Sequence, residues 1–358
     1  MQEIQHWWVF LAITVLGMGL ALALVPLAAK IGVIDHPEER KVHEEPTPLT
    51  GGPAIYLALF SFLAWHYFDN AFVQALLIGG TLIFLAGLAD DREHLSPIIR
   101  FIVQAGACVV MIFHGGVWLD DFGRLFWNDV LELGPLYIPI TVFAALGVIN
   151  AFNMIDGMDG LSGGFFLIAA AGLALYAGFA GAATMHWVLL ASVCAVLGFL
   201  LLNARFPWNA KARVFLGDSG STLLGFMLAW FFIALGNDHN ETGQRVYMPM
   251  TAVWLFAVPL MDTTFLILRR MRDRRSPLSA DRHHLHHAFL NAGFSTGQTW
   301  NRMMLMAIAG ALAGFAFELS GLPEYWSFWC FIACALAYQL YMRKAWKTHR
   351  FLGRAFIN

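Results

Sequence analysis

Long apolar stretches, separated by short charged or turn-rich breaks, dominate this chain and decide what it can fold into. Runs such as ALLIGGTLIFLAGLA are apolar on every face, which is typical of bilayer-crossing helices and excludes the alternating pattern of a membrane β-barrel. Charged residues make up only 13% of the sequence, and the mean hydropathy is +0.62. The sequence therefore predicts an all-α polytopic integral membrane protein.

A helix needs about 20 mainly apolar residues to cross a bilayer, and on this basis the chain divides into about eleven candidate transmembrane helices. Their approximate limits are 7–29, 53–68, 72–89, 98–114, 136–152, 162–180, 185–202, 214–235, 248–268, 300–320 and 325–342. The breaks are too short for a soluble domain. We therefore expect a single membrane-embedded domain over residues 1–358.

Lys and Arg are distributed unequally between the loops. If the loops after odd-numbered spans share one side, every Lys and Arg lies on that side except Arg124 and Arg245. Positive residues are enriched in cytoplasmic loops, so we expect a periplasmic N-terminus and a cytoplasmic C-terminus in a bacterial inner membrane. On the outer side, Asp120 and Asp121 are interpreted as solvated acidic surface rather than a cation site.

Five polar clusters interrupt the apolar pattern on the expected cytoplasmic face, in loops of about 30–52, 89–100, 150–164, 203–222 and 269–299. In the first, Lys41 and His43 are candidate anion-binding groups, with a basic topogenic loop as the alternative.

In the second cluster, Asp90 and Asp91 end an apolar span, where adjacent acids oppose the helix dipole. They are candidates for binding a cation or accepting a proton; a solvated helix end is the alternative. Arg100 could reach a phosphate nearby.

The third and fourth clusters combine carboxylates with glycine. Asn153, Asp156 and Asp159 recur every three residues and would share one face in helical geometry, while the interleaved glycines permit close approach of a ligand. A calcium loop is disfavoured because the ligand spacing and the terminal Glu are missing. Asp218 begins a span within LGDSGST, where free amides favour an anion and the carboxylate favours a divalent cation. This combination fits a metal–diphosphate, although it lacks the P-loop pattern.

The fifth cluster contains RHHLHH, in which His284 and His286 are the candidate ligand-binding residues. Zinc is the competing interpretation, but no cysteine joins the histidines. The other clusters supply carboxylates and Asn, which suit Mg²⁺ or Mn²⁺, so diphosphate binding by His and Arg is favoured. The four cysteines all lie within apolar spans and are expected to be buried free thiols.

Five motifs in order resemble one family of membrane enzymes, the polyprenyl-phosphate N-acetylhexosamine-1-phosphate transferases. They are RKVHEEPTPLTGG, GLADD, NAFNMIDGMDGL, VFLGDSGSTLLGF and RHHLHHAFLNAGFS. The last motif and MDTTFLILRR before it are most similar to the bacterial undecaprenyl-phosphate N-acetylglucosamine-1-phosphate transferases. The resemblance spans residues 35 to 295.

The resemblance implies transfer of N-acetylglucosamine-1-phosphate from UDP-GlcNAc to undecaprenyl phosphate, with release of UMP. The lipid-linked product would start O-antigen or related envelope glycan synthesis. Another UDP-N-acetylhexosamine, or phospho-MurNAc-pentapeptide as the transferred group, is the alternative within this reaction class. The implied partners are these two substrates and membrane lipid, with no nucleic acid, and a homodimer is considered alongside a monomer.

The resemblance also implies roles for individual residues. Asp218 would be the Mg²⁺ (or Mn²⁺) ligand with Asn153 as its helper, and Asp90 or Asp91 would take the proton of the acceptor phosphate. The remaining roles are donor-diphosphate binding by Arg100, His284 and His286, uracil contact by Asp159, and support of that loop by Asp156. Direct attack by the acceptor is favoured over a phosphoaspartate intermediate.

Two other function classes remain as alternatives. A lipid-linked sugar carrier would place ionisable residues near the bilayer midplane, but Asp262 is the only acid well inside a span. A polytopic zinc hydrolase would use the histidines as its metal site. The clustering of the other acids at one face favours an enzyme.

Overall fold

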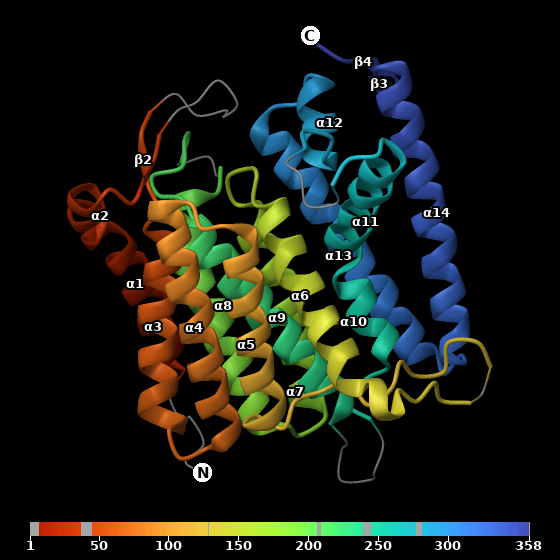
Figure 1. The fold of residues 1–358 in the computed structure, drawn as a ribbon, viewed down its shortest axis with the longest axis horizontal. Helices are drawn as coiled ribbons and strands as arrows, with labels where there is room; N and C mark the ends of the chain where they lie inside the picture. The colour runs from red at the N-terminus through yellow and green to blue at the C-terminus, as the bar shows by residue number, and fades with distance from the viewer. Residues whose placement is uncertain are drawn as a thin grey trace.

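The computed structural model describes residues 7–36, 45–127, 129–205, 209–238, 245–276 and 281–357, and most of these residues form helices that run along a common direction (Figure 1). In chain order the helices are α1 (Trp8–Ala23), α2 (Val25–Ile31), α3 (Gly51–Tyr67), α4 (Ala71–Glu93), α5 (Pro97–Phe113), the 3₁₀ helix η1 (Gly134–Leu136), α6 (Tyr137–Ile155), α7 (Leu161–Phe179), α8 (Ala183–Asn203), α9 (Gly217–Asn237), α10 (Pro249–Leu255), α11 (Ala257–Arg272), α12 (Leu285–Asn291), α13 (Thr296–Ser320) and α14 (Glu324–Thr348). Two small antiparallel ribbons pair β1 (Ile34–Asp35) with β2 (Thr47–Pro48) and β3 (Arg350–Phe351) with β4 (Arg354–Ala355).

Several helices are long and apolar enough to cross a membrane, which confirms the all-α polytopic membrane class. Within the described residues, six helices are long and apolar enough to cross a bilayer, and up to eight candidates result if the bent pairs α1–α2 and α10–α11 each form one span. All eleven predicted stretches are helical. However, α3 and α5 are 17 residues long, and α14 mixes charged and aromatic residues with its apolar ones. The structure by itself therefore supports six to eight spans.

Helix α9 occupies the centre of the bundle because its sequence is apolar around almost its whole circumference. In its most apolar window 89% of residues are buried, compared with 28% for α13. It packs against α3, α4, α6 and α7, and its Phe226, Trp230 and Phe231 side chains are fully buried. Packing on so many sides fixes the first turn of α9 in position.

Small residues allow α4 to approach the start of α9 closely. A Cβ atom on Gly87 of α4 would lie 2.5 Å from the Cα atom of Ser219, a separation that no side chain tolerates. Such small-residue contacts are typical of packed membrane helices. They bring the last turns of α4, with Asp90 and Asp91, against the beginning of α9.

The expectation of a solvated acidic surface is confirmed for Asp120, which is exposed, and is wrong for Asp121. The Asp121 residue is only 7% exposed, and both of its carboxylate oxygens accept hydrogen bonds from the Arg245 guanidinium, one of them at 2.8 Å. Pairing with a distant Arg offsets the cost of burying this acid. The adjacent-acid pattern of Asp120 and Asp121 did not indicate this partner.

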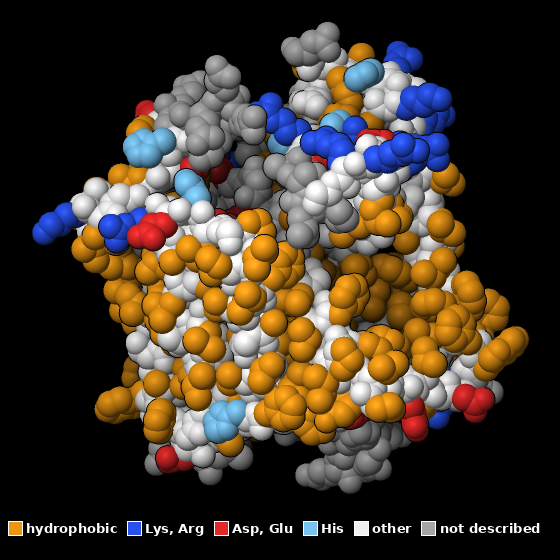
Figure 2. Space-filling view, in the orientation of Figure 1, with side chains coloured by type: hydrophobic (Ala, Val, Ile, Leu, Met, Phe, Trp, Pro, Cys, Tyr) orange, Lys and Arg blue, Asp and Glu red, His pale blue; other side chains and the backbone are white. Residues whose placement is uncertain are grey.

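The prediction of buried cysteines is wrong for half of them. Cys108 is buried and Cys194 is partly buried, but Cys330 and Cys334 are exposed on α14, and all four are free thiols. On the outside of a membrane bundle an apolar position can face lipid, so an apolar span does not require burial inside the protein. Figure 2 shows this apolar exterior as a broad band, with most of the visible Lys, Arg and His side chains at the end that carries α12.

Candidate active site

The N-terminus of α9 is capped by an acid from another helix. Asp91 of α4 accepts hydrogen bonds from the backbone N–H groups of Asp218 (2.6 Å) and Ser219 (3.1 Å). Free N–H groups and the helix dipole make this end favourable for a carboxylate. Gly217 has φ of +75°, and a Cβ atom there would lie 2.7 Å from the Asp91 carboxylate. The glycine in LGDSGST therefore permits the cap to form.

Asp218, in the first turn of α9, is held by residues of α6 and α4. The side-chain amide of Asn153, in the last turn of α6, donates to the Asp218 carboxylate at 2.5 Å and to the Ser221 hydroxyl at 3.2 Å. The Asp90 carboxyl group of α4 lies close enough to interact directly with Asp218. Asn153, Asp90 and Asp218, which are distant in sequence, thus meet at one point, as the sequence-based site requires.

The Asp90 carboxylate has a cation beside it. Arg100, at the start of α5, donates to Asp90 at 2.7 Å, and the Asp90 side chain is 5% exposed compared with 34% for Arg100. The guanidinium therefore reaches the carboxylate from the more open side of the site. Asp90 and Asp91 differ in their surroundings: Asp91 is used as a helix cap, whereas Asp90 faces Asp218 and Arg100.

The carboxylate pair suits a hard divalent cation. Within the ranges that the structure describes, no group of three or more His, Cys, Asp or Glu residues is arranged to hold a metal ion. Mg²⁺ is commonly bound by one or two carboxylates together with water and substrate phosphates. Two adjacent carboxylates repel each other, and Asp90 and Asp218 would be relieved of that repulsion by such a cation. The donor set fits Mg²⁺ better than a zinc site built from protein ligands alone.

The expectation that Asn153, Asp156 and Asp159 share one helix face is wrong. Helix α6 ends at Ile155 and α7 begins at Leu161, so only Asn153 is helical among the three polar residues. Asp156 accepts a hydrogen bond from the Ser162 hydroxyl at 2.5 Å, whereas Asp159 pairs with the Arg205 guanidinium at 2.6 Å. Gly157 and Gly160 therefore lie beyond the end of α6 and do not loosen a continuous helix.

The pKa of the Asp156 carboxyl group is raised. Burial is the largest cause of the increase, and the negative charges of Asp218, Asp91 and Asp159 raise the pKa further, whereas the hydrogen bond from Ser162 lowers it. Together they raise the pKa of the Asp156 carboxyl group to about 7. The loop therefore holds a carboxyl group that titrates near neutral pH, close to the other acids of the site.

A buried hydrogen-bond network positions His284. Its Nδ1 atom lies 2.9 Å from the Asp262 carboxylate, and this carboxylate also accepts the Leu285 backbone N–H at 2.9 Å and the Tyr338 hydroxyl at 2.7 Å. Asp262 is fully buried in α11, and its partners come from α14 and from residues 283–287, here called the histidine segment. The network directs the other imidazole nitrogen of His284 away from Asp262.

His286 is fully buried, and neither of its ring nitrogens has a hydrogen-bond partner among the described residues. Its ring lies against Gly157 in the α6–α7 segment, which links the histidines to the carboxylate region. Burial lowers the pKa of His286 well below its usual value, so burial favours the neutral form of this imidazole. A bound polyanion would favour protonation.

Two predicted site residues, Lys41 and His43, lie outside the described residues. The segment that follows them is tied to the start of α9: the backbone N–H of Gly51 donates to the Phe215 carbonyl and that of Gly52 to the Leu216 carbonyl, both at 2.9 Å. The first sequence cluster therefore leads directly to the same end of the bundle as Asp218.

Several residues that shape the site were not predicted for it. Asn203 is buried, accepts the Gly160 N–H at 2.6 Å and donates to the Val214 carbonyl at 2.8 Å, so it joins the third and fourth clusters. Its signal in the sequence is a polar amide at the end of an apolar span. Arg205 and Asp262 were visible as charged residues, but their partners are distant in sequence.

The chain is similar to known proteins over nearly its whole length. Residues 73–236, which include α4 to α9 and most of the carboxylates, match the model of glycosyl transferase family 4. The undecaprenyl-phosphate α-N-acetylglucosaminyl 1-phosphate transferase of Escherichia coli O157:H7 is 36% identical over 330 residues, covering 92% of this chain and 88% of that protein. The protein of the same name from Haemophilus influenzae is 34% identical over 349 residues and covers 96% of both chains. The chain therefore belongs to glycosyl transferase family 4, together with these undecaprenyl-phosphate α-N-acetylglucosaminyl 1-phosphate transferases.

Proposed function

We propose that this protein transfers N-acetylglucosamine-1-phosphate from UDP-GlcNAc to undecaprenyl phosphate and releases UMP. The observation that carries the proposal is the meeting of Asp90, Asn153 and Asp218 at the start of α9, in a chain whose near full-length relatives bear the name of this reaction. An oxygen of the acceptor phosphate attacks the β-phosphorus of the donor. The new P–O bond forms as the bond to the bridging oxygen breaks, and that oxygen leaves with UMP.

The residues of the site have different roles in this reaction. Asp218, with Asn153 as its helper, would hold Mg²⁺ or Mn²⁺, which neutralises phosphate charge when bound. Phosphoryl transfer depends mainly on positioning and on such charge neutralisation. Asp90 accepts the proton of the acceptor phosphate, if that phosphate arrives protonated, and Asp91 keeps the first turn of α9 in place.

Donor binding is assigned to the cationic and histidine side of the site. Arg100, His284 and His286 bind the diphosphate, and Lys41 and His43 are proposed to assist from the first cluster. Asp159 contacts the uracil, and Asp156 supports the loop that presents it. The burial of His286 and the fixed orientation of His284 support this assignment, because a polyanion supplies the partners that buried imidazoles need.

We place the active site on the cytoplasmic side of a bacterial inner membrane, in a chain that crosses it eleven times. The N-terminus is periplasmic and the C-terminus cytoplasmic. The proposal rests on the bias of Lys and Arg toward one face, a bias that Figure 2 makes visible at the end carrying α12, and on the cytosolic origin of nucleotide sugars. The lipid-linked product is proposed to start O-antigen or related envelope glycan synthesis.

One assay tests the reaction. Purified protein with undecaprenyl phosphate and Mg²⁺ is given radiolabelled UDP-GlcNAc, UDP-GalNAc, UDP-MurNAc-pentapeptide or UDP-glucose, and the lipid is extracted with butanol. We expect extractable label from UDP-GlcNAc and none from UDP-glucose. Label from UDP-MurNAc-pentapeptide instead would reassign the donor, and label from no UDP-N-acetyl sugar would refute the function.

The intramembrane acid supports an enzyme over a lipid-linked sugar carrier. Asp262 is the acid that a carrier would use at the midplane, but its oxygens accept hydrogen bonds or contacts from His284, Leu285 and Tyr338. It therefore belongs to the support of the histidine segment.

A further inference from the structure

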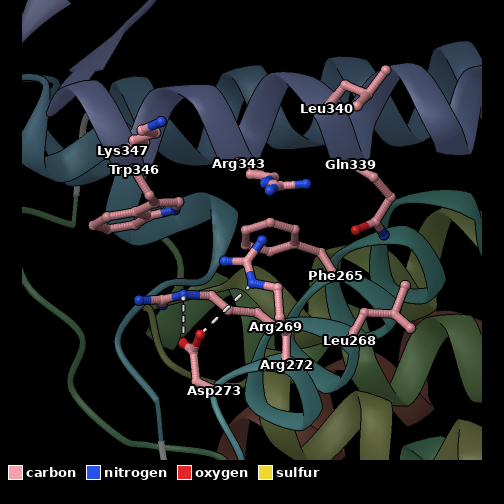
Figure 3. Close-up of a pocket in the computed structure, with 10 residues that line it drawn as sticks. All are labelled: Phe265, Leu268, Arg269, Arg272, Asp273, Gln339, Leu340, Arg343, Trp346 and Lys347. Carbon is pink, nitrogen blue, oxygen red and sulfur yellow. Dashed lines mark ion pairs between the residues drawn. The ribbon is translucent and has the colours of Figure 1, made fainter.

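A cavity of about 610 Å³ lies between α11 and α14, and nothing in the proposed reaction uses it. It is formed by the last turns of both helices, and in Figure 3 Arg343 and Trp346 extend from α14 toward α11, where Phe265 and Arg269 extend toward them. The five carboxylates grouped around α9 come from α4, the α6–α7 segment and α9 itself. Helices α11 and α14 contribute Asp262 and Tyr338 as supports of His284, and neither of these residues lines the cavity.

The cavity carries more positive than negative side chains. Arg269, Arg272, Arg343 and Lys347 line it, and Asp273 is the one acid among its lining residues. Asp273 lies 3.8 Å from both Arg269 and Arg272, and Arg269 is also shared with Asp281, outside the cavity, at 3.5 Å. In the described part of the chain, neither Arg343 nor Lys347 forms an ion pair.

The other five lining residues are apolar except Gln339, and both helices change from apolar to basic at the same level. On α11, Phe265 and Leu268 come one turn before the basic residues, and on α14 Leu340 comes one turn before Arg343. The two helices run in the same direction here. Asp262 of α11 contacts Tyr338 of α14, and further along both chains the basic C-terminal ends of the two helices meet at the cavity. A ligand in this cavity would meet hydrocarbon on one side and cations on the other.

We propose that this cavity binds the headgroup of an anionic phospholipid, with an acyl chain along the apolar side. A basic helix end alone is explained by the positive-inside rule, but that rule does not require a cavity between two basic ends or unpaired cations facing it. A soluble anion would leave Phe265, Leu268 and Leu340 without a partner. Lys and Arg near a membrane surface attract anionic lipids, and the guanidinium group of Arg matches phosphate oxygens.

The test uses the full-length protein and a readout that does not depend on turnover. Native mass spectrometry measures phosphatidylglycerol bound to the purified protein over a concentration series, without donor substrate. The double substitution Arg343→Gln with Lys347→Gln should weaken binding on the order of 30-fold, since each charge near the surface contributes several-fold. The matched control, Lys344→Gln with Arg350→Gln, removes the same charge from the same end of the chain outside the cavity and should bind as wild type does.

The other possible outcomes of the lipid-binding experiment would contradict the proposal. Equal weakening in both double variants, or none in the first, would show that no specific site exists here. Displacement of phosphatidylglycerol by glycerol phosphate would identify a soluble anion as the ligand, and preferential displacement by undecaprenyl phosphate would identify the acceptor. If the double variant does not fold, as judged by its thermal unfolding midpoint, Lys347→Gln alone should still weaken binding roughly fivefold; unchanged binding would overturn the proposal.

Discussion

Asp218 is fixed at both its backbone and its side chain. Its N–H is held by Asp91, its carboxylate by Asn153, and its neighbour across the site is Asp90. These partners come from α4 and α6, so the orientation of one carboxylate depends on two other helices. Preorganisation of this kind avoids reorganisation during the reaction.

Replacing Asp218 by Asn keeps its size and removes its charge. We expect turnover to fall by roughly 10²-fold or more, as is typical when a charge-stabilising group is lost, with expression and unfolding temperature little changed. Radiolabel transfer at several Mg²⁺ concentrations measures this, and Asp129→Asn in the outer loop is the matched control. Near wild-type turnover at saturating Mg²⁺ would move the metal to other residues.

Asp262 acts on the reaction through His284. Asp262→Asn should weaken the orientation of the imidazole, raising the KM for UDP-GlcNAc roughly 10- to 100-fold, as for other partners that orient a histidine. The KM for undecaprenyl phosphate should change much less. Tyr338→Phe removes a different hydrogen bond to the same carboxylate and serves as control; an equal effect on both KM values in Asp262→Asn would indicate general loss of structure.

The pKa of Asp156 makes stability depend on pH. Because it is raised from 3.8 to about 7, the folded protein binds more protons than the unfolded chain between these values. Stability from this group is therefore present at low pH and decreases as the pH rises through about 7. Asp156→Asn should reduce this decrease in the thermal unfolding midpoint, measured without divalent ions. An unchanged pH dependence in the variant would contradict the raised pKa.

At the scale of elements, apolar runs predicted helices because a chain in hydrocarbon must satisfy its backbone hydrogen bonds within each segment. The same logic could not find the end of α6 at Ile155, since polar residues spaced by three fit a helix and a turn equally well. Nor could it pair Asp262 with His284 or Asp121 with Arg245, because these contacts depend on how distant segments pack. Local pattern thus singled out the segments of Asp218 and His284, and the family resemblance named Asn153 as the helper of Asp218, but neither indicated Asp262 as the partner of His284.

The pairing of Asp121 with Arg245 ties the α5–α6 connection to the segment before α10. Arg245→Gln would leave a buried carboxylate without its cation, so we expect the free energy of unfolding to fall by roughly 1–3 kcal/mol, less than for a fully buried pair because Arg245 is partly exposed. The thermal unfolding midpoint reports this. Arg124→Gln, an exposed residue on the same side, should be neutral, and equal effects would contradict a specific role for the pair.

At the scale of the whole molecule, the charge bias predicts which end faces the cytoplasm. In a variant lacking the four native cysteines, Leu131→Cys should react with a membrane-impermeant maleimide in intact spheroplasts. Gly353→Cys, beyond α14, should react only after the membrane is opened. The reverse pattern would invert the proposed orientation and place the active site outside.

The capping of α9 by α4 also bears on how the protein is made. Asp91, which caps α9, is synthesised well before α9, and the two can meet only after the intervening helices have been made. We therefore expect a partly synthesised chain to lack the assembled site. Transfer to the lipid acceptor should begin only after α4, α6 and α9 have packed together.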